Sequence, residues 1–259
     1  MNFTSAELTA WIGAYLWPFF RIGAALSAAP VFGARFVSLR IRLMLALSIT
    51  LVVAPVITPM PRMDPLSFDG IFVTLQQILI GAAMGFALQL IFSAFVHAGQ
   101  IIAMQMGLGF ASLVDPQNGV QVPVLSHFYL LVVSLVFLAL DGHLAVVEVL
   151  VDSFRTMPVS PTGIAVSGLW ELVSAASFMF AGALSIALPA MTALLIVNLA
   201  FGVMSRAAPQ LNIFSIGFPL SLILGFVALW MTISGLAPQA EGLIQQGLDL
   251  MRHLSGGGR

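Results

Sequence analysis

The 259-residue chain is 60% hydrophobic and 7% charged, with a mean hydropathy of +1.07. Soluble domains carry roughly a quarter charged residues, so this composition excludes an ordinary soluble domain and predicts an integral membrane protein. The net charge of −1 and the lack of lysine exclude a basic surface for nucleic acid. Because there is no cysteine, disulfides, thiolate nucleophiles and cysteine metal sites are excluded too.

Apolar runs of about 20 residues, the length that crosses a bilayer as a helix, predict an all-α bundle in one membrane domain, residues 1–259. The start of the chain lacks the basic region of a secretory signal, so we expect no cleaved peptide. In chain order we expect helices at about Glu7 to Ala29, Ile41 to Val56, Phe68 to Met106, Val124 to Leu140, Gly168 to Met204 and Phe214 to Leu236.

Two shorter amphipathic helices are also expected. One begins after Asp141 and ends near Pro158; the other covers residues 239–254, after Pro238, and precedes a flexible glycine-rich tail. Pro189 predicts a kink in its helix. At 1.5 Å per residue the third helix is about 60 Å long, twice a bilayer of about 30 Å, so it must bend, tilt or project from the lipid.

Arginine positions do not give a consistent topology of six simple crossings. Arg35, Arg40 and Arg42 mark one cytoplasmic loop, whereas Arg206 and Arg252 cannot both lie on the same side as that loop. Some helices therefore return as hairpins or do not lie fully in lipid. The bundle is expected to contain long, kinked helices and helical hairpins.

Residues 107–123 form the longest predicted internal loop. Three glycines, two prolines and the pair Asn118-Gly119 interrupt the helical pattern there. Met104 and Met106 lead into this loop, followed by Gly107, Leu108, Gly109 and Phe110. Flexible thioether and aromatic side chains of this kind either form a seal or pack under the loop.

No pattern in the sequence predicts catalysis, a cofactor or a metal site. The four histidines, His97, His127, His143 and His253, are isolated, and no GxSxG, Walker or dinucleotide motif is present. Asp141, His143, Glu148 and Asp152 form the densest ionisable group. They would make a proton relay if they lay inside the membrane, but Gly142 and Arg155 favour a segment that leaves it.

Helix-spaced polar residues form a stripe in the third predicted helix: Gln89, Ser93, His97 and Gln100, continuing to Met104. This stripe either lines a wet lumen or forms hydrogen bonds between helices. Gly81 and Gly85 form GxxxG, which predicts close packing against a helix. Arg21 within the first helix is typical of a pairing or snorkelling residue, and the sequence does not identify its partner.

Three longer segments carry a family resemblance. They are AGQIIAMQMGLGFASLVDPQNGVQVPVL, LALDGHLAVVEVLVDSF and ALPAMTALLIVNLAFGVMSRAAPQLNIFSIGFPL, in this order. Together they resemble the FliR family of flagellar type III secretion export proteins, related to a component of virulence injectisomes, from about Trp11 to Gly235. RAAPQLNIFSIGFPL favours a flagellar member.

This resemblance implies a subunit of the export gate in the bacterial inner membrane, at the flagellar basal body, with no active site. FliP-type and FliQ-type partners would complete a helical, cone-shaped hetero-oligomer. Unfolded flagellar proteins would pass through it, and much of the apolar surface would face partner subunits above the bilayer.

Individual roles follow from the resemblance as well. The loop at 107–123 would supply a plug, with Gly107, Leu108, Gly109, Phe110, Val114, Asp115 and Pro116 as its residues. Met104 and Met106 would lie beside a methionine-rich constriction, and Arg206, Pro209 and Gln210 at the cytoplasmic entrance, near a FlhB-type switch protein. The alternative from the residues is a stand-alone secondary transporter or channel, because prolines interrupt the last helices and a polar stripe marks the third.

Overall fold

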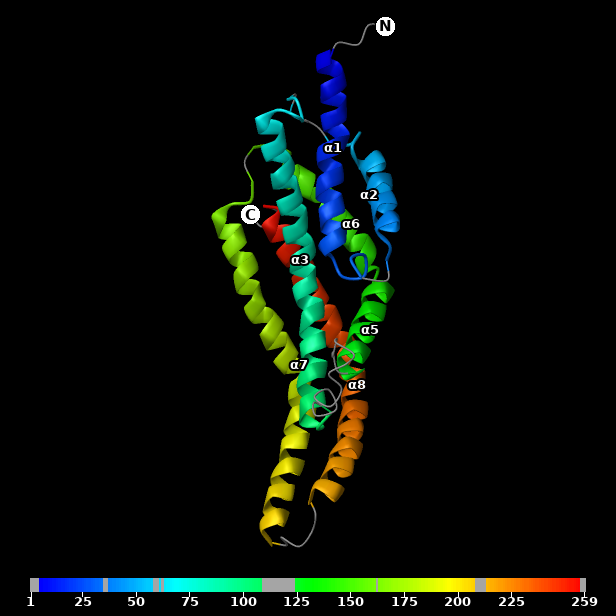
Figure 1. The fold of residues 1–259 in the computed structure, drawn as a ribbon, viewed down its shortest axis with the longest axis vertical. Helices are drawn as coiled ribbons and strands as arrows, with labels where there is room; N and C mark the ends of the chain where they lie inside the picture. The colour runs from blue at the N-terminus through cyan, green and yellow to red at the C-terminus, as the bar shows by residue number, and fades with distance from the viewer. Residues whose placement is uncertain are drawn as a thin grey trace, which may run out of the picture. The chain divides into compact units, whose positions relative to one another are not determined.

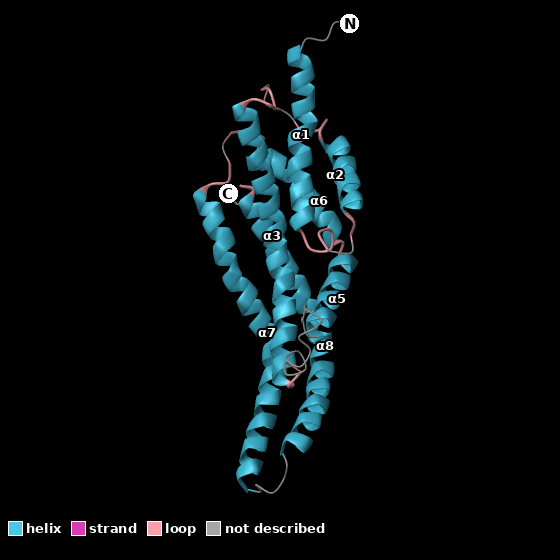
Figure 2. Cartoon of the chain, in the orientation of Figure 1, coloured by secondary structure: helices cyan, strands magenta, loops and turns pink. Residues whose placement is uncertain are grey.

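A computed structural model describes residues 5–34, 37–57, 61, 63–108, 124–161, 163–207 and 213–256. All regular secondary structure in these ranges is helical (Figure 2), which confirms the all-α fold class for the described part of the chain. The helices, labelled as in Figure 1, are α1 (Ser5–Ala28), α2 (Leu39–Val53), α3 (Phe68–Gln105), α5 (Val124–Ala139), α6 (Gly142–Thr156), α7 (Val166–Ala207) and α8 (Ile213–Leu254).

The start of α3 is fixed by a polar turn. The Ser67 hydroxyl accepts a hydrogen bond from the Gly70 N–H at 3.1 Å, which is the usual pattern of a side chain that caps a helix N-terminus. Asp64 Oδ1 accepts another from the Leu66 N–H at 2.9 Å. Asp69 in the first turn places negative charge at the positive end of the helix dipole. These contacts are local, so the predicted start at Phe68 is confirmed.

The C-terminal region differs from the expectation of two helices separated at Pro238. α8 runs without interruption from Ile213 to Leu254 and contains Pro219 and Pro238. An interior proline removes a backbone hydrogen bond and costs about 3 kcal/mol or more. After Pro238 the helix buries an apolar face that offsets this cost, since Ile244, Leu248 and Met251 are at most 2% exposed. The predicted amphipathic face exists, but it belongs to a longer helix.

α7 and the α5–α6 pair also differ from simple straight spans. α7 is continuous through Pro189, and the kink expected there stays a prediction. α5 and α6 are bent by 68° at the break between them. Asp141 adopts a left-handed conformation at this break, with φ of 55°. A short polar side chain tolerates that conformation better than most residues, so this position suits an aspartate.

The chain divides into two compact units. Unit 1 comprises Met1–Leu90, Asp141–Ala176 and Ile244–Arg259, and unit 2 comprises Ile91–Leu140 and Ser177–Leu243. α3, α7 and α8 each contribute to both units. Each unit has its own buried core and is described separately; the single membrane domain stays a prediction.

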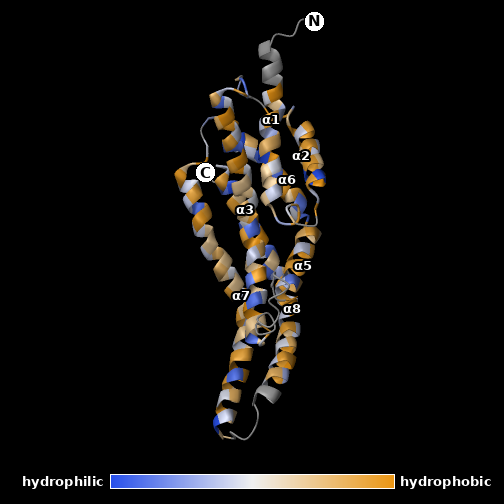
Figure 3. Ribbon diagram, in the orientation of Figure 1, coloured by the Kyte–Doolittle hydropathy of each residue, from blue (hydrophilic) through white to orange (hydrophobic). Residues whose placement is uncertain are grey.

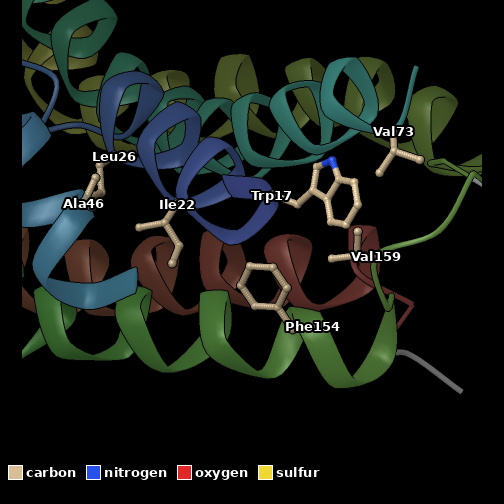
Figure 4. Packing of buried hydrophobic residues seen from close by; sticks show 7 residues of the cluster. All are labelled: Trp17, Ile22, Leu26, Ala46, Val73, Phe154 and Val159. Atoms are coloured by element: carbon tan, nitrogen blue, oxygen red, sulfur yellow. The ribbon is translucent and has the colours of Figure 1, made fainter. Parts of the chain in front are cut away.

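The core of unit 1 surrounds α1. Figure 4 shows side chains from several helices meeting there, and the fully buried Trp17 is the largest of them. The cluster consists of Trp17, Ile22, Leu26, Ala46, Val73, Phe154 and Val159. α1 also packs against α2. Since the members come from α1, α2, α3 and α6 and from the segment after α6, this cluster joins parts of the chain that are distant in sequence.

Gly81 and Gly85 allow α3 to approach α1 closely. A Cβ atom at Gly81 would collide with the backbone carbonyl of Arg21, and one at Gly85 with that of Ala25. A Cβ at Gly85 would also lie 2.8 Å from the Ala28 methyl group. The close packing expected from GxxxG is therefore confirmed, and α1 of the same chain is the neighbouring helix.

In unit 2, α3 packs against α5. The rings of Phe92 and Phe137 meet edge to face, with centroids 5.5 Å apart. Gly99 lies against the backbone of Ser126, where an added Cβ would be 2.7 Å from the Ser126 Cα. An aromatic pair and a glycine contact thus hold the two helices close.

Hydrophobic residues predominate along the helices (Figure 3), and many of the large ones are exposed. Among the described residues, four helical segments are long and apolar enough to cross a membrane, and the bent α5–α6 pair would make a fifth. They are Leu39–Val56, Phe68–Gln105, Val166–Ala207 and Gly217–Leu254. Large exposed side chains include Trp170 at 72% and Trp230 at 76%. Surface of this extent requires lipid or other protein chains around it.

Candidate functional site

The residues that the structure describes offer no metal centre. No group of three or more His, Asp or Glu side chains among them is close enough to hold an ion. His97 lies on α3, His127 on α5, His143 on α6 and His253 near the end of α8. The expectation of no metal and no cofactor stays a prediction for the whole chain.

Arg21 is buried at the centre of unit 1, between α1, α3 and α6. Its Nε donates a hydrogen bond to Gln77 Oε1 at 2.8 Å. Its Nη1 donates to the Ser153 backbone oxygen at 3.0 Å and to the Ser153 hydroxyl at 3.2 Å. The guanidinium carbon lies 4.2 Å from the centroid of the Phe154 ring, within cation–π range. These are the partners that the sequence could not identify.

No carboxylate neutralises Arg21 within the described residues, where the ion pairs all involve other side chains. Arg21 Nη2 and Gln77 Nε2 are buried without a hydrogen-bond partner. α1 is not among the four candidate spans, and burial lowers the pKa of Arg21 to about 9, so it is charged at neutral pH. The arrangement holds three helices together and does not expose a reactive group.

The ionisable group on α6 lies at the surface of unit 1. Glu148, Asp152 and Arg155 are exposed, and Arg155 pairs with Asp152 at 3.3 Å. Together with Arg252 and Ser255 from the end of the chain they border a pocket of about 230 Å³. Exposed ion pairs contribute about 0–1 kcal/mol to folding stability. We therefore interpret this cluster as the water-exposed end of a helix.

The polar stripe of α3 is only partly covered. Gln89, Ser93 and His97 are half-buried, and Gln100 is exposed. The His97 ring stacks at a tilt on Phe180, with centroids 5.9 Å apart, and its Nδ1 is buried without a partner. In the described part of the chain no side-chain hydrogen bond joins any of these residues to another helix. Within the described residues, the alternative of hydrogen bonds between helices is therefore not seen for these side chains, and the lumen alternative stays a prediction.

The end of α3 leads into the predicted plug. Met104 is 65% exposed, whereas Met106 is fully buried against Gly225 of α8. Gly107 has a φ of +81°, a conformation that favours glycine, and its position faces the Phe218 ring. The structure thus separates the two methionines, one outward and one inward.

Several predicted residues lie outside the described part of the chain. Leu108 is half-buried, but Gly109, Phe110, Val114, Asp115 and Pro116 are among the residues not described. Arg206 is exposed near the end of α7, while Pro209 and Gln210 are not described. Their roles stay predictions.

Sequence reasoning missed two glycines that contact the helices on either side of the loop, Gly99 on α3 and Gly225 on α8. The backbone of Ser126, near the start of α5, lies against Gly99. The Met106 side chain lies against Gly225. An added Cβ at Gly225 would lie 2.5 Å from Met106 Cγ. The sequence does not distinguish a helix glycine that packs against a neighbouring helix from an exposed one such as Gly235, so these two contacts could not be identified from it.

Comparison with known proteins gives one consistent result. Residues 12–247 match the family described as bacterial export proteins, family 1. The chain is 40% identical to the flagellar biosynthetic protein FliR of Pectobacterium carotovorum, over 97% of this chain and 96% of that one. The FliR of Escherichia coli K12 is 39% identical, with the same coverage. That of Bacillus subtilis is 26% identical, over 93% of this chain and 94% of that one.

Proposed function

Because the chain belongs to the family of bacterial export proteins, family 1, and is a membrane component of the flagellar export apparatus, we propose that it is a structural subunit of the flagellar export gate. With FliP-type and FliQ-type partners it forms a closed conduit for unfolded flagellar proteins. The gate lies in the bacterial inner membrane at the flagellar basal body. The chain itself catalyses no reaction and binds no cofactor.

The observation that carries this proposal is the similarity to flagellar FliR proteins over nearly the full length of both chains. The exposed apolar surface of α7 and α8 is a second support, since a subunit buried among others needs such surface. α7 and α8 continue through their prolines, so the interrupted helices that favoured a stand-alone transporter are not present in the described residues.

Residues 107–123 act as the plug of this gate. Its described ends support the proposal: Met106 and Gly107 contact α8, and the start of α5 contacts Gly99. The segment around Arg206 forms the entrance near a FlhB-type switch protein.

Copurification tests the assembly. Tagged chain extracted from membranes in mild detergent should bring down the two small membrane partners in a fixed ratio. A chain that purifies alone, is stable alone and moves a solute in vesicles would instead be the transporter or channel.

Deletion of residues 107–123 tests the plug. The resting membrane should become permeable to ions or small molecules, while a loop of the same length made of glycine and serine separates loss of the plug residues from shortening of the connection. Unchanged permeability in a complex that still assembles would contradict the plug assignment.

A further inference from the structure

The connection between α1 and α2 contains a strained turn. Val31 has a φ of 67°, a conformation that side chains branched at Cβ rarely adopt. The Phe32 N–H donates to the Pro30 carbonyl at 2.8 Å, so Val31 is the central residue of a γ-turn with positive φ, the rarer and strained form. Such a conformation costs free energy and persists only where surrounding contacts hold it.

Two contacts on the core side hold this turn. The Phe32 side chain packs against the buried cluster that contains Trp17. The Gly33 N–H donates to the Ala29 carbonyl at 2.8 Å. Gly33 also lies so close to the backbone that an added Cβ would collide with the carbonyls of Ser27 and Ala29. The turn therefore reverses the chain tightly against the end of α1 and keeps Phe32 on the core.

A third contact comes from α2. Arg42 Nη2 donates to the Ala34 carbonyl and to the Val37 carbonyl, each at 3.0 Å. Arg42 lies in the first turn of α2, where a cation is unfavourable at the positive end of the helix dipole and where no acidic residue is present. Its Nε is buried without a hydrogen-bond partner. One guanidinium thus closes the connection although its own position is unfavourable.

The surrounding sequence supplies no competitor for Arg42, since residues 8–63 contain no Asp or Glu. A carboxylate can accept two hydrogen bonds from one guanidinium and binds it more strongly than neutral carbonyls do. An acidic side chain that reaches Arg42 from outside this segment would therefore release the carbonyls of Ala34 and Val37.

We propose that Arg42 is the latch of a conformational switch in the α1–α2 connection. While Arg42 holds the two carbonyls, Val31 stays at positive φ and Phe32 stays on the core. When an acidic side chain from outside residues 8–63 pairs with Arg42, Val31 relaxes to negative φ and Phe32 loses its contact with the core. This inference does not depend on the proposed export function, because all of its contacts lie within unit 1.

Amide hydrogen exchange in the full chain, extracted from membranes in mild detergent, measures opening of the turn. A peptide that contains Phe32 and Gly33 reports it, because both N–H groups donate within the turn. Arg42→Met should speed exchange in this peptide by about tenfold, since two hydrogen bonds from a charged group are lost. Arg40→Met, at an exposed arginine in the same turn of α2, is the control and should leave exchange unchanged. Unchanged exchange in Arg42→Met would overturn the inference.

The strain at Val31 supplies a second readout. Val31→Gly removes the Cβ that makes positive φ costly, so it should slow exchange in the same peptide several-fold. Val31→Ala keeps the Cβ and should not slow exchange. Equal exchange in the two variants would also overturn the inference, because the turn would then store no strain for Arg42 to hold.

An acidic group introduced beside the latch tests the switch itself. Ser38 lies four residues before Arg42, and its side chain makes no capping hydrogen bond to α2. Ser38→Asp places a carboxylate within reach of Arg42 and should speed exchange in the peptide with Phe32 and Gly33. Ser38→Asn can cap the helix equally but carries no charge, so it should leave exchange unchanged. If the two variants exchange alike, a carboxylate does not open the latch and the proposed switch is refuted.

Discussion

The buried Arg21–Gln77 contact makes a quantitative prediction about unit 1. Arg21→Met removes the Nε bond to Gln77 and both Nη1 bonds to Ser153, and it leaves the Gln77 amide unpaired in a buried site. Hydrogen bonds to a charged group contribute about 1.5–3 kcal/mol each, but removal of a buried charge recovers part of its desolvation cost. We expect the free energy of unfolding to fall by about 2–4 kcal/mol.

Gln77→Leu should cost about as much, because it leaves the Arg21 Nε unsatisfied at a fully buried position. The double variant removes both partners together. It should therefore be less destabilised than the sum of the single variants, by about 1.5–3 kcal/mol, which is the energy of a hydrogen bond to a charged group.

Chemical denaturation in detergent micelles, followed by tryptophan fluorescence, measures these free energies. Arg155→Met is the matched control, since its exposed pair with Asp152 contributes about 0–1 kcal/mol. Single effects that add to the double effect within about 0.5 kcal/mol would refute the reasoning, because the two side chains would then not be coupled.

Three further predictions use the same assay. Gly81→Ala should destabilise the protein by about 1–3 kcal/mol, because the added methyl group meets the α1 backbone. Gly202→Ala is the control: it has open space around it and should stabilise the protein by about 1 kcal/mol through helix propensity. Equal effects of the two substitutions would contradict the close contact at Gly81. Phe154→Leu should destabilise by about 1–3 kcal/mol, since the cation–π contact and ring volume are lost; no change would mean that Arg21 does not use the ring. Asp249→Asn should change stability by less than about 1 kcal/mol, because its 2.8 Å bond to Arg252 is exposed; a larger loss would indicate that this end of α8 is covered by another chain.

Local features of the sequence predicted the fold well. The start of α3 follows from Ser67, Asp64 and Asp69, which act within a few residues of one another. The prediction of a helix end at Pro238 was wrong because the cost of a proline is local, whereas the offsetting burial of Ile244 and Met251 depends on distant helices.

The candidate site was predictable only in part. Helical spacing placed Gln89, Ser93, His97 and Gln100 on one face, but only the structure shows that, among the described residues, no side-chain hydrogen bond joins them to another helix. The close contacts of Gly99 and Gly225 could not be predicted, because a glycine in a sequence does not reveal which backbone or side chain lies against it.

The helical fold and the apolar surroundings could be predicted from the sequence, because hydrophobicity and helical periodicity are properties of short segments. The partners of Arg21 could be identified only from the folded chain. Its partners, Gln77 and Ser153, are 56 and 132 residues away in the chain, and a charge buried in an apolar bundle is stable only where folding brings such groups to it.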